Sequence, residues 1–484
     1  MTRSIITFIA CLWFATVANA KEKLPNIVLF LLDDMGYGDL SITGASGYAT
    51  PHIDRLAKEG MYFSNYYAPQ PVCSASRAGL LTGCYPNRVG FHGALSSQSN
   101  FGIHPDEQTL AEVLKKKGYT CGMVGKWHLG HTQPFLPLQH GFDDFLGLPY
   151  SNDMWPVDYE GHRVTAASNL PHKLRYPALP LIDGNEIVKE LWSLEDQAEL
   201  TTRYTERAVQ FIENNKDKPF LMYFAHSMPH VPLAVSDKFR GKSRHGLYGD
   251  VMMEIDWSVG QILALLEKLN LDDNTLVIFI SDNGPWINFG NHAGSTSGLR
   301  EAKGTTFEGG SRVPCIMRWK GVVPEGVVCN KLTCAMDILP TVAAITGAPL
   351  PVLKIDGVNL LPLIMGNTDA NPREYFAYYY RVNDLEAIRN ERFKLVLPHK
   401  HRTYEGFEPG MNGYPGKVNE QKETGLMLFD LWRDPGERYD VQLMYPHIVH
   451  QLTSVAAEVR EDLGDDLTGI PGRNRRPAQK IDQN

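Results

Sequence analysis

Four short apolar runs stand out along the chain up to residue 284. They read NIVLFLL (26–32), CGMVGKWH (121–128), FLMYFAH (220–226) and TLVIFISDNG (275–284). A continuous apolar run with β-branched members is typical of a parallel strand that is covered on both faces. We therefore predict four buried strands of one sheet.

The segments between these runs have the pattern of helices. One of them begins with Thr50, a favoured N-cap residue, and has Pro51 in its first turn. The helix-like segments are TPHIDRLAKEG (50–60), PDEQTLAEVLKKKG (105–118), LTTRYTERAVQFIENN (200–215) and YGDVMMEIDWSVGQILALLEKL (248–269). Strands that alternate with helices predict an α/β fold with a large, mostly parallel sheet between helices.

The pattern changes after about residue 362. A linker-like stretch, IMGNTDANPRE, precedes four short runs that suit antiparallel strands, namely YFAYYYRV, LEAIRN, RFKLVLP and LMLFDLW. A helix over residues 446–463 closes this smaller lobe. We expect a large α/β domain at residues 21–365, a C-terminal subdomain at 366–465, and a loose polar tail at 466–484.

The first twenty residues have the features of a secretory signal peptide. Arg3 precedes an apolar run from Ile5 to Val17, and Ala18 and Ala20 give a small-residue cleavage site. The run is too short to favour a membrane anchor, and no other stretch is long and apolar enough to span a bilayer. We expect residues 1–20 to be removed and the protein to be periplasmic or secreted. A lipoprotein processed at Cys11 is the weaker alternative.

The charge of the chain argues against one class of partner. Its 47 Lys and Arg residues against 55 Asp and Glu residues give a net charge of −8, which provides no general basic field for nucleic acid. An anionic substrate must therefore meet a local cationic pocket. The cysteines beyond the signal peptide are too widely spaced to indicate a disulfide framework, so we assign no bridges.

Acidic residues directly follow two of the predicted strands. Asp33 and Asp34 follow the first, and Asp282 and Asn283 follow the fourth. Each pair alone is also common in turns, but ligands of open α/β sheets bind at the carboxyl ends of strands. Three carboxylates and an amide oxygen form a hard-oxygen set that suits Ca²⁺ or Mg²⁺ better than Zn²⁺.

Cationic and imidazole side chains occur at comparable positions. Lys126 and His128 are two residues apart, so an extended segment points both to the same side. Further candidates follow the third strand or belong to the glycine-rich stretch AKGTTFEGGSRVP: His226, His230, Lys303, Glu308 and Arg312. Any one of them alone is more often a solvated or structural group. Together with a divalent cation they form a trap for a small tetrahedral dianion.

One cysteine lies in an unusual context, PVCSASRAGLLTG at residues 71–83. Cys73 could be a buried small hydrophobe, half of a disulfide, or a reactive group beside an anion site. Its place at the start of a predicted helix, with Arg77 one turn further on, favours an anionic group at that position.

With these motifs the chain resembles the sulfatase family, whose members depend on formylglycine. The family signature is a cysteine, any residue, usually a proline, then serine and arginine before a leucine-rich helix and Thr-Gly. Here it is Cys73-Ser74-Ala75-Ser76-Arg77 followed by AGLLTG. The resemblance extends from Asn26 to about Leu361 through LLDDMGYGDL, TPHIDRLAKEG, GKWHLGH, HGFDDFLGLPYS, SDNGP and KGTTFEGG, and DPGERYDV continues it into the small lobe.

The resemblance implies an alkaline-phosphatase-like fold and a defined set of site residues. It implies that Cys73 is oxidised to formylglycine by a maturation enzyme, and that this residue completes the shell of one Ca²⁺ ion held by Asp33, Asp34, Asp282 and Asn283. It further implies sulfate contacts from Arg77, Lys126, Lys303 and Ser151, protonation of the leaving alcohol by His230, and proton removal by His128. Ala75 departs from the commonest signature and leaves open which maturation system acts on the chain.

These implications predict a sulfuric ester hydrolase that acts on a sulfated carbohydrate, with a galactose-type sugar of a polysaccharide or glycosaminoglycan favoured. The alternatives are a phosphoester or phosphonate hydrolase of the same superfamily and an inactive receptor for sulfated glycans. We expect substrate selection in the stretches 158–180, 286–295 and 381–402, with carbohydrate contacts from Arg163, His172 and Arg402.

Overall fold

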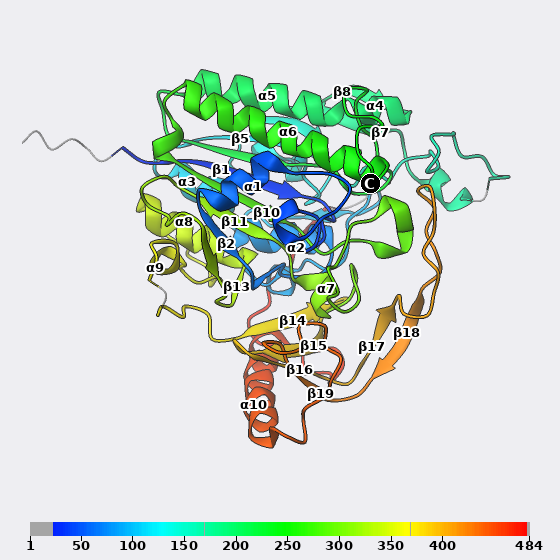
Figure 1. Cartoon of the computed structure of the whole chain (residues 1–484), viewed down its shortest axis with the longest axis vertical. Coiled ribbons are helices and arrows are strands. Elements are labelled where there is room, and N and C mark those ends of the chain that lie inside the picture. Colours follow the sequence, from blue (N-terminus) through cyan, green and yellow to red (C-terminus); the bar gives the residue numbers. More distant parts are fainter. Residues whose placement is uncertain (1–22, 169, 368, 482–484) are drawn as a thin grey trace, which may run out of the picture.

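The computed structural model describes residues 23–168, 170–367 and 369–481, and a ten-stranded mixed sheet forms its centre (Figure 1). In spatial order the strands are β12 (Val327–Cys329), β2 (Met61–Phe63), β11 (Cys315–Arg318), β10 (Thr275–Ser281), β1 (Asn26–Leu32), β9 (Phe220–Ala225), β5 (Thr120–Lys126), β6 (Asp144–Leu148), β7 (Leu179–Asp183) and β8 (Glu186–Leu191). The five strands from β10 to β6 run parallel. The four strands predicted from apolar runs are β1, β5, β9 and β10, and they lie side by side.

Strand β1 shows why these runs are apolar throughout. Ile27, Leu29 and Leu31 belong to one hydrophobic cluster, and the alternate residues from Val28 to Leu32 belong to another. Because successive side chains of a strand point to opposite faces, a strand with helices on both sides must be apolar at every position. The prediction of a sheet covered on both faces is confirmed.

Helices cover both faces of this sheet (Figure 1). Residues of α2, α3 and α8 pack in the first cluster and those of α1, α5 and α6 in the second. Their bounds are α1 (Pro51–Lys58), α2 (Cys73–Thr82), α3 (Leu110–Lys115), α5 (Leu200–Asn215), α6 (Leu247–Lys268) and α8 (Ile338–Thr346), and the shorter helices are α4 (Leu194–Ala198), α7 (Glu308–Ser311) and α9 (Leu361–Ile364). Helix α3 begins later than the sequence pattern indicates, because Thr109 and Glu112 form a capping box there.

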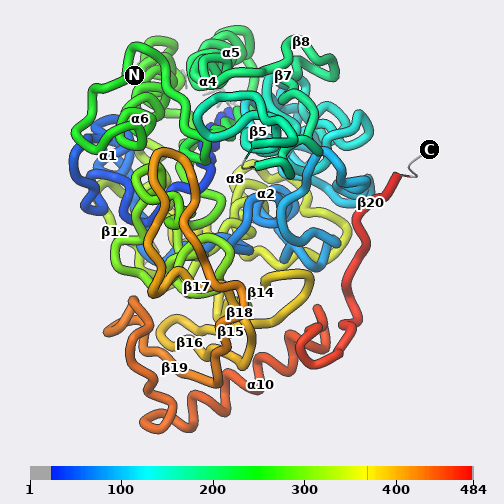
Figure 2. Tube along the Cα trace, turned by 90° about the vertical axis from the view of Figure 1, so that its right-hand side faces the viewer, coloured from blue at the N-terminus to red at the C-terminus, as the bar shows by residue number. Residues whose placement is uncertain are grey.

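The C-terminal subdomain is a four-stranded antiparallel sheet with a helix, as predicted. Its strands are β14 (Phe376–Tyr380), β15 (Asp384–Arg389), β16 (Phe393–Val396) and β19 (Met427–Asp430), in that order, and α10 (Pro446–Leu463) packs on them. A second pair, β17 (His399–Thr403) and β18 (Asn419–Thr424), forms a hairpin that projects from the subdomain across the catalytic domain (Figure 2).

The expectation of a loose polar tail is wrong for the residues that the structure describes. The chain after α10 runs back along the catalytic domain (Figure 2), where β20 (Gln479–Lys480) pairs with β4 (Phe101–Gly102). Arg476 forms an ion pair with Glu107 and its amide donates to the Arg88 carbonyl. The tail is polar because its contacts are ion pairs and backbone hydrogen bonds.

The predicted signal peptide and Cys11 lie outside the described residues. Within the described residues, no helix combines the length and apolar character that crossing a bilayer requires. The six cysteines of this part of the chain are buried and unpaired, in agreement with the absence of assigned bridges.

Candidate active site

The two acidic doublets meet because their strands are neighbours. Leu32 at the end of β1 pairs with Ser281 at the end of β10 in parallel register. The Asp34 amide donates to Asp282 Oδ1 at 3.2 Å, and Asn283 Nδ2 donates to Asp34 Oδ1 at 2.7 Å. The structure thus brings together the four residues that the sequence proposed as metal ligands.

Two site residues have unusual backbone conformations. Asp34 has φ of 64° and His128 has φ of 66°, in the left-handed region that non-glycine residues seldom adopt. Each lies two residues beyond the end of a buried strand, β1 or β5, so the chain turns at the point where the side chain enters the site. Such strain persists where surrounding structure holds it, which is typical of functional sites.

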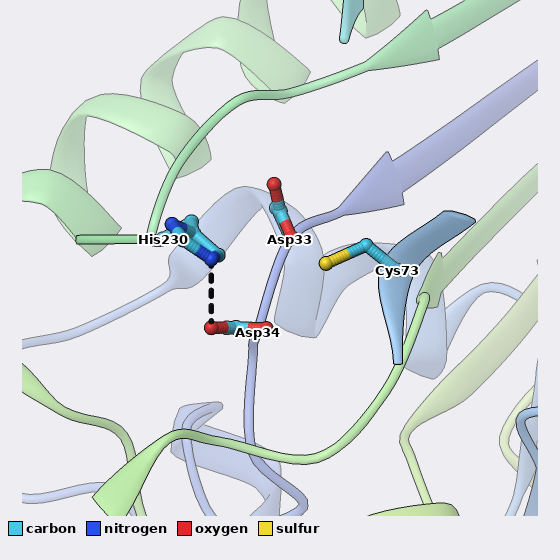
Figure 3. Close-up of side chains that lie close together, drawn as sticks. All are labelled: Asp33, Asp34, Cys73 and His230. Atoms are coloured by element: carbon cyan, nitrogen blue, oxygen red, sulfur yellow. Dashed lines mark ion pairs between the residues drawn. The ribbon is translucent and has the colours of Figure 1, made fainter. Parts of the chain in front are cut away.

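Cys73 faces these carboxylates from the first residue of α2. Its sulfur, one oxygen from each of Asp33 and Asp34, and one nitrogen of His230 all lie within 4.8 Å of one another (Figure 3). The cysteine is 2% exposed. Burial raises the pKa of its thiol to about 12, so the unmodified side chain is uncharged at neutral pH and a poor nucleophile.

Two lysines border the carboxylates from different elements. Lys126, the last residue of β5, lies 2.5 Å from Asp33 Oδ2 and donates to Ser151 Oγ at 3.3 Å. Lys303, in the glycine-rich loop, lies 2.7 Å from Asp34 Oδ1. The Gly304 amide donates to the Pro71 carbonyl at 2.9 Å, which ties this loop to the segment that leads into α2.

Arg77 has a different environment from the lysines. It donates from Nη2 to Asp282 Oδ2 at 2.8 Å and from Nη1 to the Lys126 carbonyl at 2.6 Å, and it is fully buried. These bonds occupy the guanidinium within the protein. Arg77 therefore orients the acidic residues and the end of β5.

Burial and the charges of the cluster shift the pKa values of Asp33 and Asp282 in opposite directions. Burial acts to raise the pKa of Asp33, but the charges of Lys126, His230 and Arg77 outweigh it and hold this pKa well below its usual range. Burial and the negative charge of Asp33 raise the pKa of Asp282 to about 7. A cation placed among these oxygens would favour the ionised form of both.

The histidines differ in what their ring nitrogens face. His128 Nε2 lies 2.6 Å from the Leu95 carbonyl, so it carries the proton, while Nδ1 is buried and has no hydrogen-bond partner in the described part of the chain. His230 Nδ1 lies 2.6 Å from the Val231 carbonyl, and its Nε2 is 3.5 Å from Asp34 Oδ2. Burial lowers the pKa of both. His226 stacks on Phe224 at 4.2 Å as a packing residue.

The donor set fits a hard divalent cation. Asp33 Oδ1 and Asn283 Oδ1 are buried and find no hydrogen-bond donor among the described residues, which is costly unless an ion or water satisfies them. With Asp34 and Asp282 beside them, the available atoms are carboxylate and amide oxygens, as Ca²⁺ prefers.

Of the remaining candidates, two have structural contacts, one lies beside the glycine-rich loop, and two are exposed. Glu308 and Arg312 are structural, since Glu308 accepts from Tyr67 and Arg312 donates to the Ser64 carbonyl. Arg402 lies against Gly304, because a Cβ added to this glycine would be 2.9 Å from Arg402 Nη1. Arg163 packs over the Trp192 ring at 4.1 Å, and His172 is exposed in the short helix at residues 171–175.

Sequence reasoning missed residues that contact the glycine-rich loop around Lys303. Tyr404 donates its hydroxyl to the Lys303 carbonyl, and Glu301 accepts from Thr403 and from the Tyr404 amide. Trp286 has its ring 4.4 Å from Lys303 Nζ and 5.7 Å from the His230 ring. Trp286 lies within a stretch proposed to select substrate, but no local pattern connects residues 301–303 with residues 403–404.

The family of the chain follows from comparison with known proteins. Residues 25–348 match the sulfatase family, residues 371–473 match the C-terminal region of aryl-sulfatase, and residues 302–408 match the C-terminal region of N-sulphoglucosamine sulphohydrolase. The chain therefore belongs to the sulfatase family.

Individual relatives agree with this assignment. N-acetylgalactosamine-6-sulfatase of Mus musculus is 37% identical over 95% of this chain and 90% of its own length. Arylsulfatase A of Bos taurus is 37% identical over 89% of this chain and 86% of its own length. The crystal structure of PsFucS1 sulfatase from Pseudoalteromonas sp. superposes with a TM-score of 0.81 at 27% identity, covering 94% of this chain and 92% of that one. The protein is a sulfuric ester hydrolase, as the sequence motifs predicted.

Proposed function

We propose that the protein is a calcium- and formylglycine-dependent sulfatase that removes sulfate from a galactose-type sugar of a polysaccharide or glycosaminoglycan. The observation that carries this proposal is the buried cluster of Asp33, Asp34, Cys73 and His230, bordered by the ammonium groups of Lys126 and Lys303. The relatives named as N-acetylgalactosamine-6-sulfatases support the choice of sugar.

Two groups would complete the site. Asp33, Asp34, Asp282 and Asn283 would hold one Ca²⁺ ion, which supplies positive charge that attracts the sulfate group and lowers the pKa of a hydroxyl beside it. Formylglycine at residue 73 would supply that hydroxyl, as the hydrated aldehyde, for attack on sulfur. Both groups account for features of the site: buried oxygens that find no donor among the residues the structure describes, and a thiol too weakly acidic to react itself.

The residues around residue 73 bind the sulfate. Lys126 and Lys303 reach the cluster from different elements, β5 and the glycine-rich loop, and each has ammonium protons beyond those used by its aspartate. Ser151 adds a hydroxyl next to Lys126. These donors stabilise charge that develops on the sulfuryl oxygens as the ester bond breaks. Arg77 acts indirectly, because it holds Asp282 and the backbone of Lys126 in place.

His230 and His128 transfer protons, each through one ring nitrogen. His230 Nε2 faces the cluster and, once protonated, donates to the oxygen of the departing sugar. His128 Nδ1 has no hydrogen-bond partner among the described residues, and Nε2 is fixed by its contact with the Leu95 carbonyl; Nδ1 would take a proton from a hydroxyl of hydrated formylglycine at residue 73.

The cellular context of this activity is part of the proposal. We infer export to a periplasm or to the outside through the signal peptide at residues 1–20, and oxidation of Cys73 by a formylglycine-generating enzyme during that passage. The substrate is then a glycan outside the cytoplasm.

One pair of measurements tests the proposal. Mass spectrometry of the tryptic peptide that contains residue 73, from protein of the native host, is expected to show an aldehyde in place of the thiol. Sulfate release from 4-nitrophenyl sulfate is expected to exceed phosphate release from 4-nitrophenyl phosphate. An intact thiol without turnover would support an inactive glycan receptor, and faster phosphate release would support a phosphoester hydrolase. The family assignment favours neither alternative.

A further inference from the structure

A row of aromatic rings leads away from the catalytic cluster. The row begins at His230 and continues through Trp286, Phe289, Tyr159 and Tyr414, with successive centroid distances of 5.7, 4.8, 5.4 and 5.6 Å. Phe289 is buried, whereas Trp286, Tyr159 and Tyr414 remain partly exposed. We call the last four residues the aromatic wall.

The aromatic wall touches the reacting groups at one end. Trp286 lies beside both Lys303, which would bind sulfate, and His230, which would protonate the leaving sugar oxygen. A sugar ring whose oxygen is within reach of His230 must therefore lie next to the Trp286 indole. Tyr159 and Tyr414 lie at the far end of the wall, where the rings of Trp286 and Phe289 separate them from the cluster.

Three separate segments build this wall and fix its geometry. Tyr159 comes from the loop before β7, Trp286 and Phe289 follow β10, and Tyr414 comes from the tip of the β17–β18 hairpin. The amides of Gly410 and Gly416 donate to the Asn288 carbonyl at 2.7 and 2.6 Å, and the Asn412 amide donates to Asn291 Oδ1 at 2.8 Å.

A glycine allows the close contact between the hairpin tip and the segment after β10. A Cβ on Gly290 would lie 1.9 Å from the Gly410 carbonyl oxygen, and Gly290 has φ of 58°. Backbone contacts thus hold the hairpin tip in place, and Tyr414 meets Tyr159 edge-to-face at an interplanar angle of 73°.

We propose that the aromatic wall is a subsite for the pyranose rings of a glycan, with the ring that carries the sulfate at Trp286 and the next ring at Tyr159 and Tyr414. A pyranose has a face of C–H bonds that carries partial positive charge, and an aromatic face carries partial negative charge. Tyr and Trp offer such contact at a low cost in conformational entropy. A galactose-type ring, whose axial hydroxyl leaves the opposite face uninterrupted, suits Trp286.

This inference rests on the proposed function and extends it, because it predicts a preference for chains over single sugars. The matured enzyme is assayed on galactose 6-sulfate and on a tetrasaccharide that ends in the same sulfated sugar. We expect higher kcat/KM on the tetrasaccharide, and we expect the double variant Tyr159→Ala/Tyr414→Ala to reduce the ratio of the two efficiencies by about tenfold or more. The matched control is Trp432→Ala, whose indole is 62% exposed on the C-terminal subdomain and which should preserve the ratio.

A binding measurement makes the test independent of turnover. The Cys73→Ala variant is titrated with the same two sugars, and the tetrasaccharide is expected to bind more tightly and to change tryptophan fluorescence. Adding Trp286→Phe should remove most of that fluorescence change while binding persists. Equal affinity for the two sugars, or an unchanged efficiency ratio in the double variant, overturns the subsite. If the wild-type enzyme releases sulfate from no ester, the proposed function fails, and the titration still decides whether the wall binds glycan.

Discussion

Replacing Arg77 tests whether the acidic cluster depends on a buried cation for stability as well as for geometry. Its guanidinium makes hydrogen bonds of 3.0 and 2.8 Å to Asp282 Oδ2 and one of 2.6 Å to the Lys126 carbonyl, with no exposure to solvent. In Arg77→Ala the Asp282 carboxylate loses its paired charge in a site that water does not reach. Breaking a buried ion pair from one side costs about 3–5 kcal/mol.

The expected change in melting temperature follows from the length of the chain. An unfolding entropy of about 2.1 cal/mol/K per residue, over 484 residues, amounts to about 1 kcal/mol/K, so Arg77→Ala should lower Tm by about 3–5 °C. Differential scanning calorimetry in the presence of EDTA measures this without a contribution from calcium. The matched control is Arg203→Ala, which removes an exposed pair with Glu199 of similar length, 2.9 Å, and should cost less than about 1 kcal/mol.

A second substitution separates the charge effect from loss of packing. In Arg77→Ala/Asp282→Asn the unpaired charge is absent, so the double variant should be more stable than the sum of the single effects predicts, by about 1–3 kcal/mol. Additive effects, or a Tm for Arg77→Ala within about 1 °C of the wild type, would refute the reasoning that Arg77 stabilises the cluster by compensating Asp282.

Three further expectations concern the same region. Lys126→Ala and Lys303→Ala should each lower kcat on an aryl sulfate by about 10²–10³-fold while Lys400→Ala, which removes an exposed ammonium, should not; equal activity of all three would contradict the sulfate-binding role. EDTA should lower Tm and added CaCl₂ should restore it, because calcium at 100 times its Kd stabilises the folded state by about 2.7 kcal/mol; a Tm indifferent to both would exclude the ion. Burial raises the pKa of Glu386, whose carboxyl group accepts a hydrogen bond from Thr306, to about 8. Because the unfolded-state pKa is lower, the folded protein loses stability as the pH rises from about 4.5 towards 8. The Tm of Glu386→Gln should therefore equal that of the wild type near pH 4.5 and exceed it at pH 8, and a Tm difference that does not change with pH would contradict this.

Much of the catalytic centre was predictable because its signals are local. An apolar run such as residues 26–32 predicts a strand buried on both faces, and the polar pair that follows it, Asp33 and Asp34, must lie at the carboxyl edge of the sheet. The helix start at Cys73 and the placement of Lys126 at the end of a strand were recognisable for the same reason. The oxygen character of these residues predicted a hard divalent cation, and the structure places the four residues side by side.

The order of the strands was not predictable from local patterns. Strand β9 lies between β1 and β5 although it follows both in sequence, and in this order Lys126 Nζ lies 2.5 Å from Asp33 Oδ2. The sequence does not show which short apolar runs become neighbours in the sheet, since the strand order depends on how the helices between the strands pack.

Contacts between distant segments required the tertiary structure for a related reason. The polar tail was expected to be loose, yet Arg476 pairs with Glu107, because a charged residue shows no preference for a partner until folding brings one within a few ångströms. The same holds for Tyr404 on the Lys303 loop and for the meeting of Tyr414 with Tyr159. The sequence by itself determined the strands, the polar pairs at their ends and the helix that begins at Cys73, since propensity and periodicity act over a few residues. Which charges neutralise each other and which aromatic rings meet beside the cluster were decided only by long-range packing.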